Sequence, residues 1–441
     1  MLKRVEGRED KSGACVAISE ARFPSPFASG LEYAAPARGT WNIVHTGMLV
    51  PEAHEIFVCA SGCLRGVVLT AAEMNAQDRF STIAIRENNV LDGDMEELII
   101  DGVSDILSKL PRLPRAVLLY TSCIHQFMGC DLPLVYDRLR EMFPGVDFTD
   151  CYMNPTMRKS GLTPDQLMRR QLYSLLRPRP IDEHAVNILG NDLATDGDSD
   201  IVRLIKGAGY RQREITSMNT YDEYQEMASA ALNITYNPAA VAGGEALAKR
   251  LGTEHMYLPL SYGYDEIEQS MTKLAMRLGA KLPDFSTARE RCEKALAAAR
   301  SVIGDAPVAI DYTISSRPLS LARLLLEHGF NVTRIYVDSI TEEEKGDFER
   351  VRELRPKLEL YSTMNVKMRF MERKTDEKTL AIGQKAAYFT GSDYFVNVVE
   401  GGGMYGFDGI AKLAELMSEA FTTAKDARAL IQIKGMGCGC V

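Results

Sequence analysis

Two cysteines flank a histidine in YTSCIHQFMGCDL, residues 120–132 of the chain. An apolar run, AVLLY, leads into this stretch and predicts a buried strand, and DLPLVYDRLREMF predicts an amphipathic helix after it. Cys123 therefore falls just past a strand end, and Asp131 is a good N-cap for the helix. Thiolates in such a turn could bind a soft metal, whereas the alternative is that Cys123 and Cys130 are small residues packed in a core. His125 is a candidate ligand or a hydrogen-bonded turn residue.

A second pair of cysteines lies in HEIFVCASGCLRGVV, residues 54–68. Cys59 and Cys63 are four positions apart, so on a helix they would share one face. A zinc ribbon needs two intervening residues instead, and no third cysteine follows where a radical S-adenosylmethionine site would place it. Alone, the pair fits either a metal site or two thiols packed beside Gly62.

The chain has nine cysteines, and its polar N-terminal segment, MLKRVEGREDKSG, lacks the apolar core of a secretory signal. The odd number and the missing signal make disulfides unexpected, so metal or redox chemistry competes with simple burial as the role of these thiols. The nine positions are 15, 59, 63, 123, 130, 151, 292, 438 and 440.

Composition limits the class of protein. The chain has 441 residues, 46% of them hydrophobic and 25% charged, which is typical of a globular protein of about three domains. Its net charge of −9 argues against nucleic acid and anionic membranes as partners. No run approaches the roughly 18 apolar residues of a membrane span. We therefore expect a cytoplasmic protein.

Short apolar runs alternate with amphipathic segments from about residue 115 onward. ALNITYN and APVAIDYT, for example, each precede a helical pattern, and several of these helices end at glycine. Such alternation predicts an α/β protein with three doubly wound, Rossmann-like domains and parallel sheets. RPRPIDEH and GDAP are candidate linkers, and a long helix at 285–303 would bridge the last two domains. The predicted domains are 1–180 with both cysteine pairs, 181–304, and 305–441 with a C-terminal helix and tail.

Several segments together resemble one family. The turn SCIHQFMGCD resembles the Cys-Pro-x-x-x-Ile-Gly-Asp-Asp turn of nitrogenase component 1 subunits, and HEIFVC resembles their His-Gly-Pro-x-Gly-Cys segment. EGGGMYGFDGIAKLAELM resembles the segment of the molybdenum-iron α subunit that contains His-Gly-Phe-Asp-Gly. Strand and helix segments between them resemble the family in the same order. The resemblance covers nearly the whole chain and implies three α/β domains.

The resemblance also implies an iron–sulfur cluster, 4Fe–4S or P-cluster-like, at the interface with a sister subunit or a second copy of the chain. An ATP-hydrolysing iron protein would be the electron donor. Cys15, Cys59 and Cys123 match the family's cluster ligands, although the gap from Cys15 to Cys59 is longer than usual. Cys63 is a fourth ligand or a replacement for Cys15, and the partner chain is another source of a fourth ligand. Cys130 then replaces the family's first Asp, and His125 matches no ligand.

Two ligands of the family's large cofactor are absent. The cysteine belongs where this chain has Tyr236 and Asn237, and the histidine belongs where it has Tyr405. Dinitrogen reduction is therefore not expected, unless a partner chain holds that cofactor. The resemblance leaves small-molecule reduction, such as reduction of a tetrapyrrole or a carbon–sulfur bond, and allows a second metal–sulfur or substrate-site cofactor. Tyr236, Asn237 and Tyr405 are expected to line the cleft, and the expected cofactor-binding residues are Gly401, Gly402 and Gly403.

Three hypotheses of function follow. The first is a catalytic subunit of a nitrogenase-like reductase, the second is a non-catalytic scaffold that assembles a metal–sulfur cofactor, and the third is a plain α/β binding protein with packed cysteines. The acidic segment DGDSD lacks the spacing of a calcium loop and predicts a helix N-terminus. The final CGCV is a poor prenylation box, so Cys438 and Cys440 either touch a metal or belong to a free tail.

Overall fold

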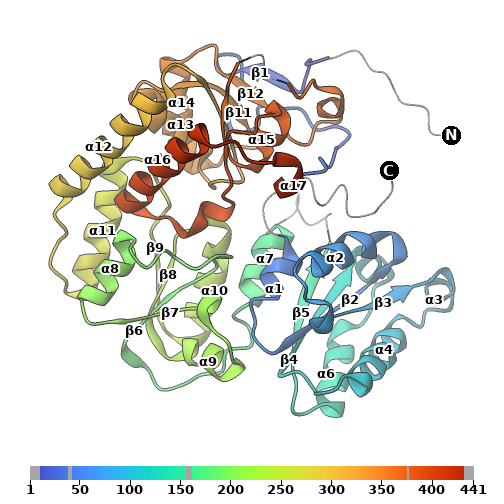
Figure 1. Cartoon of the computed structure of the whole chain (residues 1–441). Helices are drawn as coiled ribbons and strands as arrows, with labels where there is room; N and C mark the ends of the chain where they lie inside the picture. Colours follow the sequence, from blue (N-terminus) through green and yellow to red (C-terminus); the bar gives the residue numbers. More distant parts are fainter. Residues whose placement is uncertain (1–9, 38–41, 155–160, 375–376, 432–441) are drawn as a thin grey trace. The chain divides into compact units, whose positions relative to one another are not determined.

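The computed structural model of the chain describes residues 10–37, 42–154, 161–374 and 377–431. Cys438 and Cys440 lie outside the described residues. The chain divides into two compact units (Figure 1). Unit 1 contains Met1–Thr40, Thr195–Ala208 and Leu260–Val441, and unit 2 contains Trp41–Ala194 and Gly209–Pro259.

The first sheet of unit 2 has four parallel strands in the order β3-β2-β4-β5. Its central strands bury both faces, because alternate residues of β2 and β4 enter two separate apolar clusters. The strands are β2 (Ala53–Ala60), β3 (Phe80–Ile85), β4 (Ala116–Ser122) and β5 (Asp147–Met153). The helices are α1 (Ile43–Gly47), α2 (Ser61–Glu73), α3 (Glu87–Asp92), α4 (Met95–Lys109), α5 (Cys123–Met128), α6 (Leu132–Met142) and α7 (Pro164–Gln171), with a 3-10 turn at Gln77–Arg79.

The second sheet of unit 2 repeats this plan. Its four parallel strands stand in the order β7-β6-β8-β9. The elements are β6 (Asp182–Ile188), β7 (Arg211–Glu214), α9 (Tyr221–Glu226), β8 (Ala230–Thr235), α10 (Val241–Leu251) and β9 (Glu254–Tyr257), with 3-10 turns at Ile215–Ser217, Met227–Ser229 and Pro238–Ala240.

Unit 1 contains one six-stranded sheet in the order β1-β12-β11-β10-β13-β14. All its neighbouring strands are parallel except β1, which pairs antiparallel with β12 at the edge. The strands are β1 (Cys15–Ala17), β10 (Pro307–Asp311), β11 (Asn331–Tyr336), β12 (Glu359–Tyr361), β13 (Leu380–Ile382) and β14 (Phe395–Val396). The helices are α8 (Asp200–Gly207), α11 (Tyr264–Leu278), α12 (Phe285–Ile303), α13 (Pro318–Glu327), α14 (Lys345–Leu354), α15 (Gln384–Thr390), α16 (Gly406–Thr422) and α17 (Ala427–Ile431), with 3-10 turns at Glu342–Glu344, Val366–Phe370 and Glu400–Gly403.

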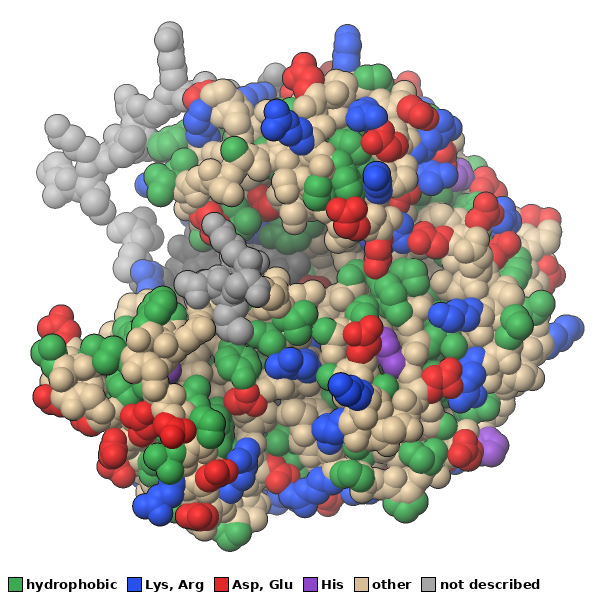
Figure 2. All heavy atoms as spheres, turned by 180° about the vertical axis from the view of Figure 1, so that it is seen from behind, with side chains coloured by type: hydrophobic (Ala, Val, Ile, Leu, Met, Phe, Trp, Pro, Cys, Tyr) green, Lys and Arg blue, Asp and Glu red, His purple; other side chains and the backbone are tan. Residues whose placement is uncertain are grey.

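Charged side chains of both signs are interspersed over the face of the molecule seen in Figure 2. Many of them are paired, as Arg289 is with Asp265 and Glu268. None of the helices in the described ranges is long and apolar enough to cross a membrane.

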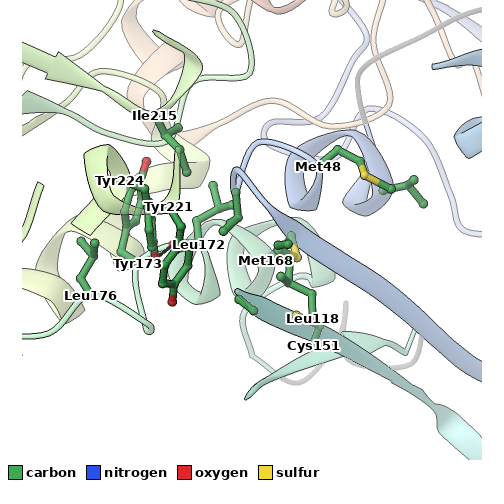
Figure 3. Close-up of a cluster of buried hydrophobic side chains, with 14 of the residues drawn as sticks. Met48, Leu118, Cys151, Met168, Leu172, Tyr173, Leu176, Ile215, Tyr221 and Tyr224 are labelled. Atoms are coloured by element: carbon green, nitrogen blue, oxygen red, sulfur yellow. Dashed lines mark hydrogen bonds between the residues drawn. The ribbon is translucent and has the colours of Figure 1, made fainter. Parts of the chain in front are cut away.

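Helix α7 connects the two sheets of unit 2 through a shared apolar cluster (Figure 3). Thr163 caps the helix by accepting a hydrogen bond from Gln166 N, and Pro164 occupies the first turn, where its missing N–H costs nothing. Met168 faces the first sheet, and Leu172 and Tyr224 lie toward the second, where the Tyr224 hydroxyl donates to Leu172 O at 2.6 Å. The cluster fixes the second sheet against the helix that follows the first.

Each sheet reverses its strand order once. In unit 2, β2 and β4 are neighbours although the chain visits β3 between them, and β6 and β8 stand in the same relation around β7. In unit 1 the corresponding neighbours are β10 and β13. In open parallel sheets, ligands bind outside the carboxyl ends of the strands at such a reversal. The fold therefore offers three positions for a site.

The predicted fold class is confirmed, since the chain is α/β with doubly wound parallel sheets. Helix α12 matches the predicted helix at 285–303 residue for residue. The antiparallel strand β1 was not predicted, because its three residues are too few for a readable alternation. The division into 1–180, 181–304 and 305–441 stays a prediction.

Candidate functional site

Three of the predicted ligands lie around the reversal point of the first sheet. Cys59 is the penultimate residue of β2, Cys63 lies in the first turn of α2, and Cys123 is the first residue of α5, directly after β4. Because β2 and β4 pair in parallel, with Val58 opposite Thr121, both strands end at the same edge. Cys59 and Cys63 do not share a helix face as the sequence suggested, since Cys59 belongs to the strand.

The three thiols differ in exposure and act on one another. Cys59 is buried, Cys123 is partly buried and Cys63 is exposed. Burial, together with the neighbouring Cys63 and Cys123, raises the pKa of Cys59 to about 12. No lysine or arginine is among the groups that act on Cys59. Cys59 is therefore a sulfur donor with no neighbouring cation that would stabilise its thiolate.

A short turn fixes Cys123. His125, only 1% exposed, accepts a hydrogen bond from Ser122 N through Nδ1 at 3.1 Å, because burial lowers its pKa and keeps the ring neutral. The Cys130 N–H then bonds His125 O at 3.0 Å, across Gly129, whose φ of +68° favours glycine. His125 is therefore a capping residue of the turn. Ser122 three residues before it was the available signal, although capping boxes usually carry Glu or Gln at that position.

The other cysteines have different surroundings. Cys15 lies in unit 1 on β1, opposite Tyr361, and burial with the neighbouring Glu359 raises its pKa to about 11. Cys292 is buried and its thiol donates to Phe407 O at 3.0 Å. Cys151 is buried on β5, in the apolar cluster of Figure 3. Cys292 and Cys151 behave as the small buried residues of the alternative interpretation.

The reversal point of the second sheet carries Tyr236 and Asn237, which directly follow β8. Tyr236 is buried, and the Asn237 side chain accepts from Ala239 N at 3.0 Å and so caps the next 3-10 turn. The neighbouring strand β6 leads to Asp192, whose carboxylate lies 2.6 Å from the guanidinium of the buried Arg169. Thr46 donates to the other Asp192 oxygen at 3.1 Å. The sequence did not predict this pair, because Arg169 belongs to α7 and Asp192 to a distant loop, and no local sequence pattern links the two.

A second buried pair escaped prediction in the same unit. Glu55 on β2 is 1% exposed, and its Oε1 accepts a hydrogen bond from the Tyr120 hydroxyl at 3.1 Å. Burial raises the pKa of Glu55 well above its usual value, so the fold favours the protonated carboxyl. The pair has room only because Gly47 lacks a side chain, since a Cβ there would collide with both groups.

The predicted glycine loop and Tyr405 belong to unit 1. Glu400, Gly401, Gly402 and Gly403 all have positive φ and form one left-handed turn. Glu400 N and Gly401 N bond the carbonyls of Thr313 and Ile314 at 2.9 Å each, which fixes the turn beyond the carboxyl end of β10. Tyr405 is buried and its hydroxyl interacts with Ser270. The contact with Ser270 fits a packing and hydrogen-bonding role for this tyrosine.

The acidic DGDSD segment forms a helix start, as predicted. Asp196 accepts from Asp198 N at 3.1 Å and pairs with Lys412, and Ser199 is the N-cap of α8. Across the described residues, no group of three or more His, Cys, Asp and Glu side chains is arranged to hold a single metal ion.

Comparisons with known proteins identify the family and the fold. The sequence profile of the nitrogenase component 1 type oxidoreductases matches residues 44–422. The fold resembles a solved structure described as "Nitrogenase Cp1 at pH 6.5", with a TM-score of 0.66 and 13% identity over 90% of this chain and 94% of that one. A second, "Nitrogenase Cp1 at pH 5", gives a TM-score of 0.58 and 13% identity over 93% and 94%. No curated protein sequence matches significantly. The chain belongs to the nitrogenase component 1 type oxidoreductase family.

Proposed function

We propose that the chain is a catalytic component subunit of a nitrogenase-like reductase, which receives electrons from an ATP-hydrolysing iron protein and reduces a small molecule other than dinitrogen. The observation that carries the proposal is the group of Cys59, Cys63 and Cys123 at one sheet edge. Proteins of this family bind metal–sulfur clusters.

The donors at this edge fit an iron–sulfur cluster. Thiolate sulfur is the ligand that such clusters use, and each thiolate binds a separate iron, so the donors need not converge on one point. Space for the group exists beside Cys63, since no atom outside the chain neighbours and helix backbone of Gly62 lies within 4 Å of where a Cβ of this glycine would be. Ala60, the N-cap of α2, makes no side-chain hydrogen bond to the first turn, so the free N–H groups favour negative charge near Cys63.

The protein's own groups would divide the work. Cys59 would hold the cluster from the buried side and Cys63 from the exposed side, where a sister subunit or second copy could cover it. The turn capped by His125 would hold Cys123 in place. The cluster, when bound, supplies one-electron transfer. Cys15 has Glu359 and Tyr361 as neighbours, and we rank it as the weakest of the four proposed ligands.

The residues at the positions of the missing cofactor ligands support a substrate other than dinitrogen. Asn237 caps a turn and the Tyr405 hydroxyl interacts with Ser270. Neither side chain supplies a thiolate or an imidazole. Substrate and any second cofactor would instead meet backbone, as at Gly401, Gly402 and Gly403.

Anaerobic purification with iron and sulfide analysis tests the cluster. The wild-type chain should be brown, and Cys123→Ser and Cys59→Ser should lose most of the iron and the cluster's EPR signal while the far-UV circular dichroism stays unchanged. Cys292→Ser is the matched control, because its thiol is buried and donates to a backbone carbonyl that serine can also reach. A colourless wild-type chain without iron after reconstitution would refute the proposal, and unchanged iron in Cys123→Ser would remove that ligand.

The second candidate function is a scaffold that assembles a metal–sulfur cofactor and transfers it. It is favoured by the lack of thiolate and imidazole ligands at Asn237 and Tyr405, which suits temporary holding. Turnover of a tetrapyrrole or carbon–sulfur substrate that requires both an iron protein and ATP would exclude a purely scaffolding role. Transfer of iron and sulfide to an apo-acceptor without turnover would favour it.

A further inference from the structure

A cavity of about 760 Å³ opens in unit 1 at the amino ends of β10, β11, β12 and β13. This is the opposite end of the sheet from its reversal point, so the cavity is separate from the glycine loop at 401–403. Its size is within the range of small-molecule sites, roughly 300–1,000 Å³. The lining residues are Pro307, Thr333, Arg334, Arg355, Pro356, Lys357, Glu359, Lys374, Glu377 and Thr379.

The lining carries an excess of positive charge. Four cationic side chains face two carboxylates, Glu359 and Glu377, on a chain whose net charge is −9. Glu359 already accepts a hydrogen bond from the Tyr361 hydroxyl at 2.8 Å. The four cations are Arg334, Arg355, Lys357 and Lys374.

These cations are also unpaired, unlike their neighbours. Among the described residues, no carboxylate oxygen lies within ion-pair distance of any of the four, whereas Arg350 and Arg352 on the adjacent α14 pair with Glu353 and Glu349. Arginines elsewhere on this acidic chain find carboxylates readily. Glu359 and the Tyr336 hydroxyl act on Arg334, so Arg355, Lys357 and Lys374 are the three cations that indicate a position for an anion.

Neutral partners and packed neighbours position two of these cations without neutralising them. Arg355 donates to Asn331 Oδ1 at 2.7 Å, which fixes its guanidinium and leaves its charge. Lys374 follows Arg373, whose guanidinium lies 4.6 Å above the Tyr388 ring and whose carbonyl packs against Gly391. A pre-positioned charge loses less entropy when it binds a ligand.

We propose that this cavity binds a small multivalent anion, whose phosphate or carboxylate groups pair with Arg355, Lys357 and Lys374. Guanidinium and ammonium groups recognise both kinds of anion, because each presents charged N–H donors to several oxygens. The proposal does not depend on the cysteine site, since every residue that carries it lies in unit 1.

Isothermal titration of the full chain tests the proposal, with inorganic pyrophosphate as the phosphate probe and citrate as the carboxylate probe, at constant ionic strength. The double variant Lys357→Gln/Lys374→Gln should bind about tenfold more weakly or worse, since each lost charge-assisted contact costs about that factor. Arg355→Gln should weaken binding as well. The matched control is Arg350→Gln/Arg352→Gln, which removes the same charge from exposed positions outside the cavity.

The titration has one supporting outcome and two refuting outcomes. Saturable binding of one or both probes that is weakened in the cavity variants and retained in the control supports the site, and the preferred probe identifies the anionic group. Absence of saturable binding of both probes to the wild-type chain refutes it. Equal weakening in the control also refutes it, because general attraction to cationic side chains would then explain the result.

Discussion

The two sheets of unit 2 have the same strand order, yet their reversal points differ in chemistry. Beyond β6 and β8, Arg169 and Asp192 form a buried ion pair that Thr46 completes. Beyond β2 and β4 the same position holds Cys59 and Cys123, with no cation acting on the buried thiol. An internal ion pair fills the reversal point of the second sheet. The reversal point of the first sheet has sulfur donors, and no cation acts on the buried one. An identical topology can therefore serve either stability or binding, and the side chains decide which.

The third sheet provides another example of a filled reversal point. Asp311 ends β10, is completely buried, and accepts hydrogen bonds from Thr313 N and Ala386 N. Gly383 packs directly against its carboxyl. Its position is thus occupied by an internal connection, as at Asp192. The cysteine edge, by contrast, is proposed to hold an external metal–sulfur group.

The largest expected effect on the free energy of unfolding comes from breaking the buried Arg169–Asp192 ion pair. Asp192→Asn removes the closer of the two carboxylates that pair with the buried Arg169 and leaves only Asp165 at 3.3 Å, which should lower the free energy of unfolding by about 3 kcal/mol. Urea denaturation followed by circular dichroism measures this. Asp182→Asn, at the amino end of the same strand β6, removes partly exposed pairings with Arg211 and Arg213 and should cost only about 1 kcal/mol. Equal losses in the two variants would contradict the comparison.

The next effect is a pH dependence at Asp311. Burial raises its pKa from 3.8 to about 6 in the folded chain, so the fold favours the protonated carboxyl. Its contribution to stability is complete below about pH 4 and is lost as the pH rises to about 6, at about 1.4 kcal/mol per pKa unit. Asp311→Asn should therefore lose less stability between pH 4 and 7 than the wild-type chain, as measured by urea midpoints.

An exposed aspartate supplies the control of opposite sign. Hydrogen bonds from Thr287 lower the pKa of Asp284 at the N-cap of α12, so its contribution is present at neutral pH and is lost as the pH falls. Asp284→Asn should therefore reduce the loss of stability that the chain shows as the pH falls. A pH profile unchanged by Asp311→Asn would show that this carboxyl is not a titrating contributor.

A smaller effect on stability is expected at the turn that holds Cys123, where His125 is the capping residue. His125→Ala removes the acceptor of Ser122 N and should cost about 1–2 kcal/mol in stability. It should also lower the iron retained after reconstitution, because Cys123 would lose its fixed position. His125→Asn, whose side chain can accept the same hydrogen bond, should restore part of both. Full iron content in His125→Ala would contradict the positioning role.

The smallest change in stability is expected for Cys123→Ser, and it tests directly whether the cysteine edge is structural. Cys123→Ser in the metal-free chain should change the free energy of unfolding by less than about 0.5 kcal/mol, because the thiol is only partly buried and has no structural partner to lose. Urea denaturation of the chain after anaerobic chelation measures it. A loss as large as that in Asp192→Asn would show that the cysteine edge is structural too.

The sequence predicted what depends on local pattern. Alternating apolar runs placed strands such as β4, β6, β8, β10 and β11 and the long helix α12. The order of SCIHQFMGCD, HEIFVC and the GFDG segment predicted the family, which the profile match confirms. Cys123 falls at a strand end with Asp131 capping α6, as the turn chemistry implied. These features depend on few neighbours, so a single sequence contains them.

What the sequence could not supply depends on contacts between distant segments. The Arg169–Asp192 and Glu55–Tyr120 pairs join separate elements, and no periodicity marks their partners. Strand β7, RQRE, is polar and lies at a sheet edge, where burial does not impose an apolar pattern. Cys59 and Cys63 were judged by helical spacing, but a strand ends between them. The ligand and cleft assignments stay predictions.

The edge strand β1 has a consequence for how the chain is made. Its partner β12 begins at Glu359, so β1 leaves the ribosome long before the strand on which it folds. At roughly 5–20 residues per second, the wait is on the order of tens of seconds, and the whole of unit 2 has been synthesised in the meantime. We therefore expect unit 2 to fold during translation, while the segment that carries Cys15 stays accessible to chaperones and oxidants until synthesis is nearly complete.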